Sequence, residues 1–185
     1  MLGYFWKTPE VKPSKDDISV SVAESVTAGA VGNSLCAEPG ASNYFKGAIT
    51  AYSIASKKEI LGIDTKYAEE TNHANPFTTL EMAKAVCKMF KSRFGIATTG
   101  YSLPYHREEN KEKNECALDI KKPYAYICLY DSLTNEEIIV REDFDYDENG
   151  NRATQRATVQ AKVAIKATQM YQEKVKKIKE IANTT

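Results

Sequence analysis

The sequence has no excess of either charge: 25 lysine and arginine residues balance 25 aspartate and glutamate residues. Proteins that bind nucleic acids or anionic membranes by electrostatic attraction carry a basic excess. The balance therefore argues against a general nucleic-acid binder and against a membrane-surface binder. No stretch approaches the roughly 20 consecutive apolar residues that a membrane-spanning helix needs, so no transmembrane segment is expected.

Histidine is scarce and cysteine is scattered. The only histidines are His73 and His106, and the four cysteines form no C-x-x-C pair. So few potential ligands argue against a zinc site, and no metal is expected. Unpaired, scattered cysteines are typical of a reduced, cytoplasmic protein in which most of them lie in the core.

A chain of 185 residues is long enough to bury the core of one domain. Its first 17 residues, "MLGYFWKTPEVKPSKDD", contain aromatic residues but no continuous apolar stretch and no small-residue cleavage site, so they are not a secretion signal. We interpret residues 1–17 as an N-terminal arm and residues 18–185 as the domain.

Strand and helix patterns alternate along residues 18–100. "ISVSVAE" is a β-branched, alternating stretch that predicts a strand, and "TAGAVGNSLCAEPG" predicts a helix of small residues. A strand through Gly47 to Ser53 and a short helix "ASKKEILG", with Gly62 at its C-cap, come next. "TTLEMAKAVCKMFKSRFG" predicts an amphipathic helix ended by Gly95, and "IATT" a short buried strand.

The second half of the chain predicts a hairpin and a long helix. A charged, unpatterned run over 105–122 is expected to be an exposed loop. "YAYICLYD" and "EEIIVREDFDY" predict two antiparallel strands, and a turn at "DENGN" leads into the longest helix. The whole pattern indicates an α/β fold: a single-domain, three-layer α/β/α sandwich with a mixed sheet.

Ser25 lies where the first predicted strand gives way to a helix. Backbone N–H groups are unpaired at the start of a helix, so a hydroxyl there could attack a carbonyl while the N–H of Val26 or Thr27 stabilises the oxyanion. The alternative is that Ser25 only caps the helix, as serine commonly does.

A serine nucleophile also needs a base. There is no G-x-S-x-G motif, and neither histidine is obviously placed for this role. A lysine can serve when burial lowers its pKa. Lys57 and Lys58 are the candidates, although adjacent lysines on a helix are commonly exposed to solvent.

Three blocks of the sequence resemble a known family. "AES.T.G", "PGASNYFKGAITAYS...K..ILGI" and "TTG...P" are similar to the C-terminal domain of the CinA family, the nicotinamide-nucleotide amidohydrolases. The resemblance covers roughly residues 19–168, and its second block is the specific one. Arg152 and Arg156 match the arginines of the family pattern "GDR..VR".

The resemblance implies a Ser-Lys amidohydrolase that converts nicotinamide mononucleotide to nicotinic acid mononucleotide and ammonia. By position, Ser25 would attack the carboxamide, Lys57 rather than Lys58 would accept its proton, and Tyr52 would orient or relay that proton. Such chemistry uses side chains and water, so no cofactor is expected. The substrate-binding residues implied are Thr27, Thr99, Gly100, Arg152 and Arg156.

The arginine pair also has a simpler interpretation. Arg152 and Arg156 are four residues apart and therefore share one helical face. They could hold a phosphate at the start of the last helix, or they could be ordinary surface arginines. The resemblance favours phosphate binding.

The sequence departs from the family pattern around the expected site. Ala28 replaces a glycine, and Tyr101, Ser102 and Leu103 replace a small-residue stretch, with no glycine pair after Pro104. Two hypotheses follow. The chain is an amidohydrolase acting on a small pyridine nucleotide, or it is an inactive homologue that serves as a nucleotide-binding or oligomerisation module. Because relatives associate, a homodimer or larger assembly is expected.

Overall fold

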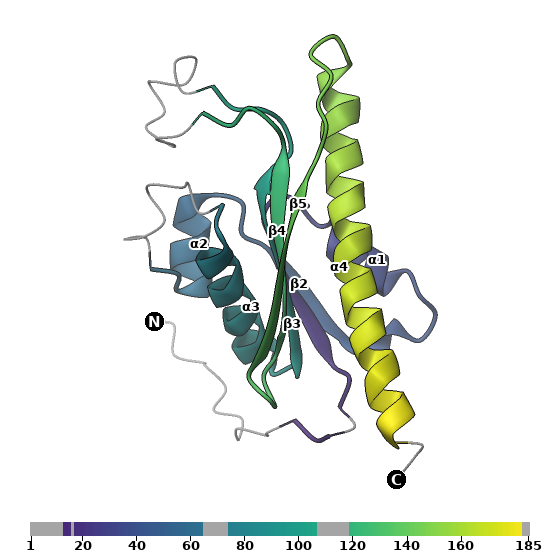
Figure 1. Cartoon of the computed structure of the whole chain (residues 1–185). Coiled ribbons are helices and arrows are strands. Elements are labelled where there is room, and N and C mark those ends of the chain that lie inside the picture. Colours follow the sequence, from purple (N-terminus) through teal and green to yellow (C-terminus); the bar gives the residue numbers. More distant parts are fainter. Residues whose placement is uncertain (1–12, 16, 65–73, 107–118, 183–185) are drawn as a thin grey trace.

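The chain forms a five-stranded sheet covered by helices on both faces (Figure 1). The computed structural model describes residues 13–15, 17–64, 74–106 and 119–182. Helices α1 and α4 cover one face of the sheet, and α2 and α3 cover the other. The elements are β1 (Val20–Glu24), α1 (Ala30–Cys36), the 3₁₀ turn η1 (Ala41–Asn43), β2 (Phe45–Thr50), α2 (Ile54–Leu61), α3 (Pro76–Phe90), β3 (Phe94–Tyr101), β4 (Tyr124–Asp131), β5 (Glu136–Asp143) and α4 (Arg152–Ala182).

The sheet is mixed, with strand order β2-β1-β3-β4-β5. β1 pairs in parallel with both β2 and β3, because each of these connections crosses over through helices. β3 and β4, and β4 and β5, pair antiparallel, the second pair as a tight hairpin. The predicted three-layer α/β/α sandwich with a mixed sheet is confirmed.

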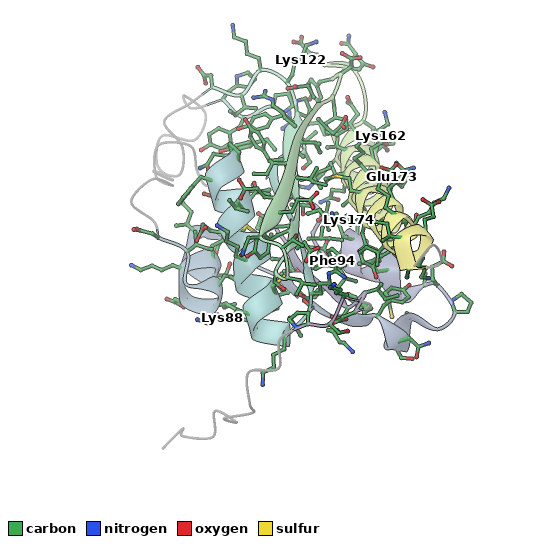
Figure 2. The ribbon with its side chains drawn as sticks, turned by 60° about the horizontal axis from the view of Figure 1, so that its bottom comes forward. Lys88, Phe94, Lys122, Lys162, Glu173 and Lys174 are labelled. Atoms are coloured by element: carbon green, nitrogen blue, oxygen red, sulfur yellow. The ribbon has the colours of Figure 1, made fainter. Side chains whose placement is uncertain are left out.

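Alternation along the strands divides the core into two layers. On β1, Val20 and Val22 face α1 and α4, whereas Ala23 faces α2 and α3. Phe94 is fully buried in the first layer, and Lys162 and Glu173 lie along the outer surface of α4 (Figure 2). The central strands β1, β3 and β4 are therefore buried on both faces, whereas the edge strands β2 and β5 are partly exposed.

Two predicted helix boundaries are wrong. The first helix begins at Ala30 rather than at Thr27, because residues 25–29 form a turn in which Ala28 and Gly29 have φ of 51° and 106°. The third helix ends at Phe90, and Lys91 follows as a C-cap in the left-handed conformation, with φ of 54°. Gly95 instead lies inside β3, where a Cβ would come within 2.2 Å of the Ala83 carbonyl oxygen. Its lack of a side chain allows α3 to pack closely on the sheet.

A buried ion pair attaches the segment before β1 to the rest of the domain. The Arg93 guanidinium forms two hydrogen bonds with Asp131, of 3.1 and 2.9 Å, and also donates to the main-chain oxygens of Lys15 and Asp17. Arg93 holds the pKa of Asp131 below its ordinary value, against the opposing effect of burial. The final residues of the predicted arm thus contact the domain, while residues 1–12 and most of the predicted 105–122 loop lie outside the described residues. No described helix is long and apolar enough to cross a membrane.

Candidate active site

The carboxyl ends of the parallel strands converge on one cavity. β1 leads to α1 on one face of the sheet, and β2 leads to α2 on the other. The connections that follow these two neighbouring strands therefore leave the sheet on opposite faces. Ligands in open α/β sheets bind at such switch points. The cavity here has a volume of about 720 Å³. Its lining comes from the ends of β1 and β3, from α2, from the segment after β3 and from the start of α4.

Ser25 lies on the floor of this cavity and does not cap a helix. It follows β1 directly, is 6 % exposed, and donates its main-chain N–H to the Thr98 carbonyl at 2.9 Å. Its side chain bonds Lys57, with 3.0 Å between Oγ and Nζ. The N–H groups of Val26 and Thr27 donate no hydrogen bond within the described part of the chain. The capping interpretation of Ser25 therefore fails, and two candidate oxyanion donors lie beside its hydroxyl.

Lys57 is buried, although it lies on a helix whose outer face is exposed. It is 3 % exposed and points inward from α2, whereas its neighbour Lys58 is exposed. Burial lowers the pKa of Lys57 to about 8. Nζ also donates to the main-chain carbonyl of Tyr52 at 3.1 Å. Nζ donates to Ser25 Oγ as well, and in its neutral form the amine is within reach to accept the hydroxyl proton instead, as a general base must.

Glu24 fixes the turn that carries Ser25, a role that was not predicted for it. Its carboxylate is fully buried and accepts hydrogen bonds from the main-chain N–H groups of Gly29, Val31 and Gly32, at 2.9, 3.1 and 2.7 Å. Glu24 thus supplies the N-terminal cap of α1 from outside the helix. An acidic residue at the end of a buried strand was the available signal.

Thr27 belongs to this buried network and not to the cavity lining. Its hydroxyl donates to Glu24 at 2.6 Å, and it lies 2.6 Å from the Thr98 hydroxyl. Because the carboxylate takes the Thr27 proton, Thr98 must be the donor of the second bond. The prediction that the Thr27 side chain binds substrate is therefore corrected: this side chain has a structural role beside Glu24. Thr99, the next residue along β3, does line the cavity.

Arg152 and Arg156 line the cavity from the start of α4, and Tyr52 lines it from the link between β2 and α2. The two arginines share one face of the helix, as predicted. Arg156 donates to the hydroxyl of Tyr52, whose side chain is 55 % exposed, and Arg152 donates to the hydroxyl of Tyr146 at 3.3 Å. Tyr52 thus contacts Lys57 through its main chain and Arg156 through its phenol, and a proton relay through the phenol stays a prediction.

Gly100 lies where β3 reaches the cavity, and its position is dictated by the neighbouring strand. Its φ is 152°, and a Cβ there would lie 2.2 Å from the Tyr124 carbonyl oxygen. We expect Gly100→Ala to lower the free energy of unfolding by about 2–3 kcal/mol, measured by urea denaturation. Gly62→Ala is the control: φ is 68° but no heavy atom lies within 4 Å of the added Cβ, so about 1 kcal/mol is expected. Equal losses would contradict this account.

The segment after Gly100 forms one wall of the cavity. Its residues 101–106 all line it, including His106, which the sequence did not single out as a site residue. His73 lies outside the described residues. Within the described residues, no group of three or more histidine, cysteine, aspartate or glutamate side chains is placed to hold a metal ion.

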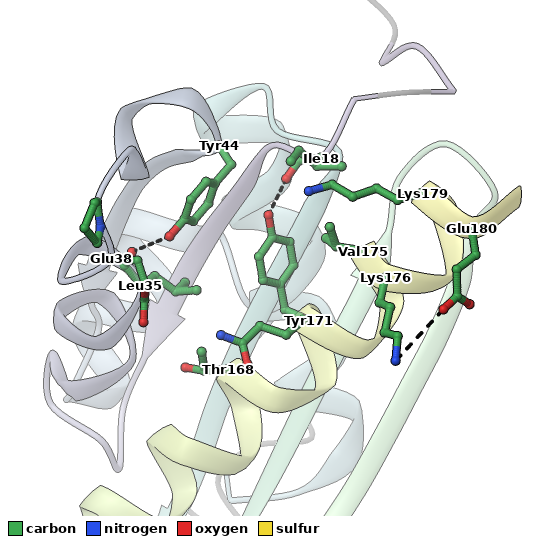
Figure 3. A pocket seen from close by; sticks show the side chains of 12 residues that line it. Ile18, Leu35, Glu38, Tyr44, Thr168, Tyr171, Val175, Lys176, Lys179 and Glu180 are labelled. Carbon is green, nitrogen blue, oxygen red and sulfur yellow. Dashed lines mark hydrogen bonds and ion pairs between the residues drawn. The ribbon is translucent and has the colours of Figure 1, made fainter. Parts of the chain in front are cut away.

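A second cavity, of about 540 Å³, lies between the C-terminal half of α4 and the segment that follows α1 (Figure 3). Its phenols are bonded to main-chain oxygens: Tyr171 donates to Ile18 at 2.6 Å and Tyr44 to Leu35 at 2.8 Å. Among the residues that the structure describes, its lining contains no serine and none of the sequence-predicted site residues. The first cavity is therefore the candidate active site.

Residues 12–174 match the CinA family, described as the CinA C-terminal domain. A CinA-like protein of Flavobacterium psychrophilum is 35 % identical over 106 residues, covering 57 % of this chain and 25 % of that protein. A CinA-like protein of Fervidobacterium nodosum is 33 % identical over 128 residues, covering 69 % and 31 %. The chain thus spans about a quarter to a third of the length of these relatives.

Solved structures show the same fold. The CinA superfamily protein from Escherichia coli superimposes with a TM-score of 0.64 at 18 % identity, covering 84 % of this chain and 81 % of that one. The family match extends over nearly the whole described domain and includes Ser25, Lys57 and the two arginines. The chain therefore belongs to the CinA family, through its C-terminal domain.

Proposed function

We propose that this chain is an amidohydrolase that converts nicotinamide mononucleotide and water to nicotinic acid mononucleotide and ammonia. One observation carries the proposal: the Ser25 hydroxyl lies 3.0 Å from the amine of a buried lysine whose pKa is lowered to about 8, on the floor of a cavity. A buried lysine without a carboxylate partner among the described residues is costly for the fold. Its place beside a serine is typical of a nucleophile and its base.

In the first half of the reaction, Ser25 Oγ attacks the carboxamide carbon while the neutral Lys57 amine takes the hydroxyl proton. The negative charge that develops on the carboxamide oxygen is stabilised by the N–H groups of Val26 and Thr27. Lys57 then gives its proton to the leaving nitrogen, the carbon–nitrogen bond breaks, and ammonia departs. An ester between Ser25 and the nicotinoyl group remains.

In the second half, water hydrolyses this ester. Lys57, neutral again, takes a proton from water as the oxygen attacks the ester carbon, and returns it to Ser25 Oγ when the carbon–oxygen bond breaks. The carboxylate product leaves and the site returns to its starting state. All proton transfers pass through Nζ, which the Tyr52 carbonyl holds in place.

The substrate phosphate is assigned to Arg152 and Arg156. Both line the cavity at the start of α4, where the helix dipole adds to their positive charge. Arginine matches a phosphate better than lysine does, because its planar guanidinium forms two parallel hydrogen bonds. In the proposed complex, the charged tail of the substrate lies beside the two arginines and its amide lies beside Ser25.

The alternative function is an inactive homologue that binds a nucleotide or mediates oligomerisation. The wall formed by residues 101–106 departs from the pattern of the resembled family and supports this alternative. The retained Ser25–Lys57 pair favours catalysis, because packing alone gives no reason to bury a lysine. Association into a homodimer and a cytoplasmic location remain predictions.

The test is ammonia release from nicotinamide mononucleotide at high enzyme concentration. We expect release by the unmodified chain and only the background rate with Ser25→Ala, since this variant lacks the attacking oxygen. Thermal shift with the same nucleotide identifies the alternative: a shift without ammonia indicates binding without turnover. Absence of both would reject the amidohydrolase and the nucleotide-binding module together.

A further inference from the structure

Two tyrosines of the cavity wall have no part in the reaction steps above. Resting on the proposed function, we infer that Tyr101 and Tyr105 recognise the flat ring that carries the carboxamide, and that the preferred substrates bear a cationic aromatic ring. Both residues line the cavity that contains Ser25 and Lys57. They belong to the segment that departs most from the family pattern, so this contact is a property of this chain.

The two tyrosines begin a row of four aromatic rings. The centroids of Tyr105 and Tyr101 are 5.8 Å apart, and the same distance separates Tyr101 from Tyr124 and Tyr124 from Tyr126. Only the first two of these rings line the cavity. The remaining two continue the row along β4, away from the lining.

The far part of the row is fixed by polar contacts. Tyr124 is buried and donates its hydroxyl to the Ala74 carbonyl at 3.2 Å. The Arg141 guanidinium lies 4.4 Å from the centroid of Tyr124 and 5.7 Å from that of Tyr126, and it forms an ion pair with Asp143. Tyr101 is therefore backed by a rigid neighbour and presents a preorganised surface to the cavity.

The composition of the cavity defines the ligand. Ser25 and Lys57 are suited to react with an amide, and Arg152 and Arg156 are suited to bind an anionic group. The face of a tyrosine ring attracts a cation by its quadrupole and packs well against a flat ring. A pyridinium carboxamide with an anionic tail matches the reactive pair, the arginines and the tyrosine rings. The tyrosines would then distinguish a charged, planar ring from an uncharged one.

Binding in a Ser25→Ala background tests this inference without turnover. Calorimetry would compare nicotinamide mononucleotide with ribose 5-phosphate, which retains the tail but lacks the ring. We expect the complete nucleotide to bind about tenfold more tightly. Tyr101→Leu and Tyr105→Leu should each reduce this ratio severalfold with little effect on ribose 5-phosphate. Tyr101→Phe, which keeps the ring, should preserve it.

Tyr126→Leu is the matched control, because it removes a ring from the same row outside the cavity lining. In this variant, the ratio of the affinities for nicotinamide mononucleotide and ribose 5-phosphate should equal that of the Ser25→Ala protein. The reduced, uncharged form of the nucleotide should bind more weakly than the cationic form, and both leucine variants should shrink that difference. Unchanged ratios in the Ser25→Ala background, together with deamidation of the nucleotide by the unmodified chain, would overturn only this inference. Failure of the unmodified chain both to bind and to deamidate it would overturn the proposed function as well.

Discussion

Exchange of Lys57 for methionine is expected to lower kcat for nicotinamide mononucleotide about 10³-fold, with KM changed little. Methionine has nearly the length of lysine and fills the same buried space, but it cannot accept a proton from the Ser25 hydroxyl. Loss of a general base costs typically 10²- to 10⁴-fold. Steady-state ammonia release gives both constants, and a rise in KM alone would show that Lys57 only contributes to binding.

The rate of the unmodified enzyme should follow the protonation state of Lys57. Since its pKa is lowered to about 8, most of the amine is charged at pH 6 and unable to act as a base. We expect kcat/KM to rise nearly tenfold per pH unit below pH 8 and to level off above it. A profile that is flat from pH 6 to pH 9 would exclude Lys57 as the base.

The same lysine makes the fold less stable at neutral pH. Its pKa is about 8 when folded and 10.5 ordinarily, so the unfolded chain binds the proton more tightly. The cost is present in full below about pH 8, and stability rises as pH increases from 8 toward 10.5. Lys57→Met should therefore increase the free energy of unfolding at pH 7 by about 2 kcal/mol, less than the shift alone implies because two hydrogen bonds are lost.

Lys58→Met is the control for both effects. Lys58 precedes the helix C-cap and is exposed, so neither the rate nor the stability should change appreciably. Urea denaturation at pH 7 and pH 10 measures the stability of both variants. A gain for Lys57→Met that is equal at the two pH values would indicate improved packing instead of relief of a buried charge.

Hydrophobic alternation was sufficient to predict the architecture. The alternating β-branched residues of β1 and the apolar runs of the hairpin predicted their strands. The periodicity of α3 and α4 predicted both helices. Boundaries failed where backbone conformation decides them: no pattern indicated that Ala28 and Lys91 take left-handed conformations.

The site was predicted only in part. Ser25 and Lys57 are 32 residues apart and meet because β1 and β2 are parallel neighbours, a contact that local spacing cannot reveal. The family resemblance supplied that pairing. It could not supply the orientation of Thr27 or of the Tyr52 phenol, since motif positions carry no side-chain direction. Glu24 was missed because its place at the end of a buried strand does not indicate which main-chain N–H groups its carboxylate meets.

Replacement of Glu24 by alanine is expected to lower the free energy of unfolding by about 4 kcal/mol. Three main-chain N–H groups and the Thr27 hydroxyl would lose their acceptor in a buried place, and each unsatisfied donor costs about 1–3 kcal/mol when water cannot replace the partner. Some water entry into the space left by the side chain keeps the total below the sum. Urea denaturation measures the loss, and Glu38→Ala, at an exposed glutamate after α1, should cost under about 0.5 kcal/mol.

Glu24→Gln separates the charge from the shape. One carboxylate oxygen of Glu24 accepts from Thr27, Gly29 and Val31, and the other accepts from Gly32 at 2.7 Å. Glutamine can keep its oxygen toward the first three donors, but its NH₂ group then faces the Gly32 N–H. We expect about half the loss seen with alanine, and a fall in kcat with KM maintained, because the turn that positions the Ser25 hydroxyl loosens while the two arginines of α4 stay in place. Full activity in a destabilised Glu24→Gln protein would show that this carboxylate supports α1 alone and leaves the nucleophile positioned by Thr98 and Lys57.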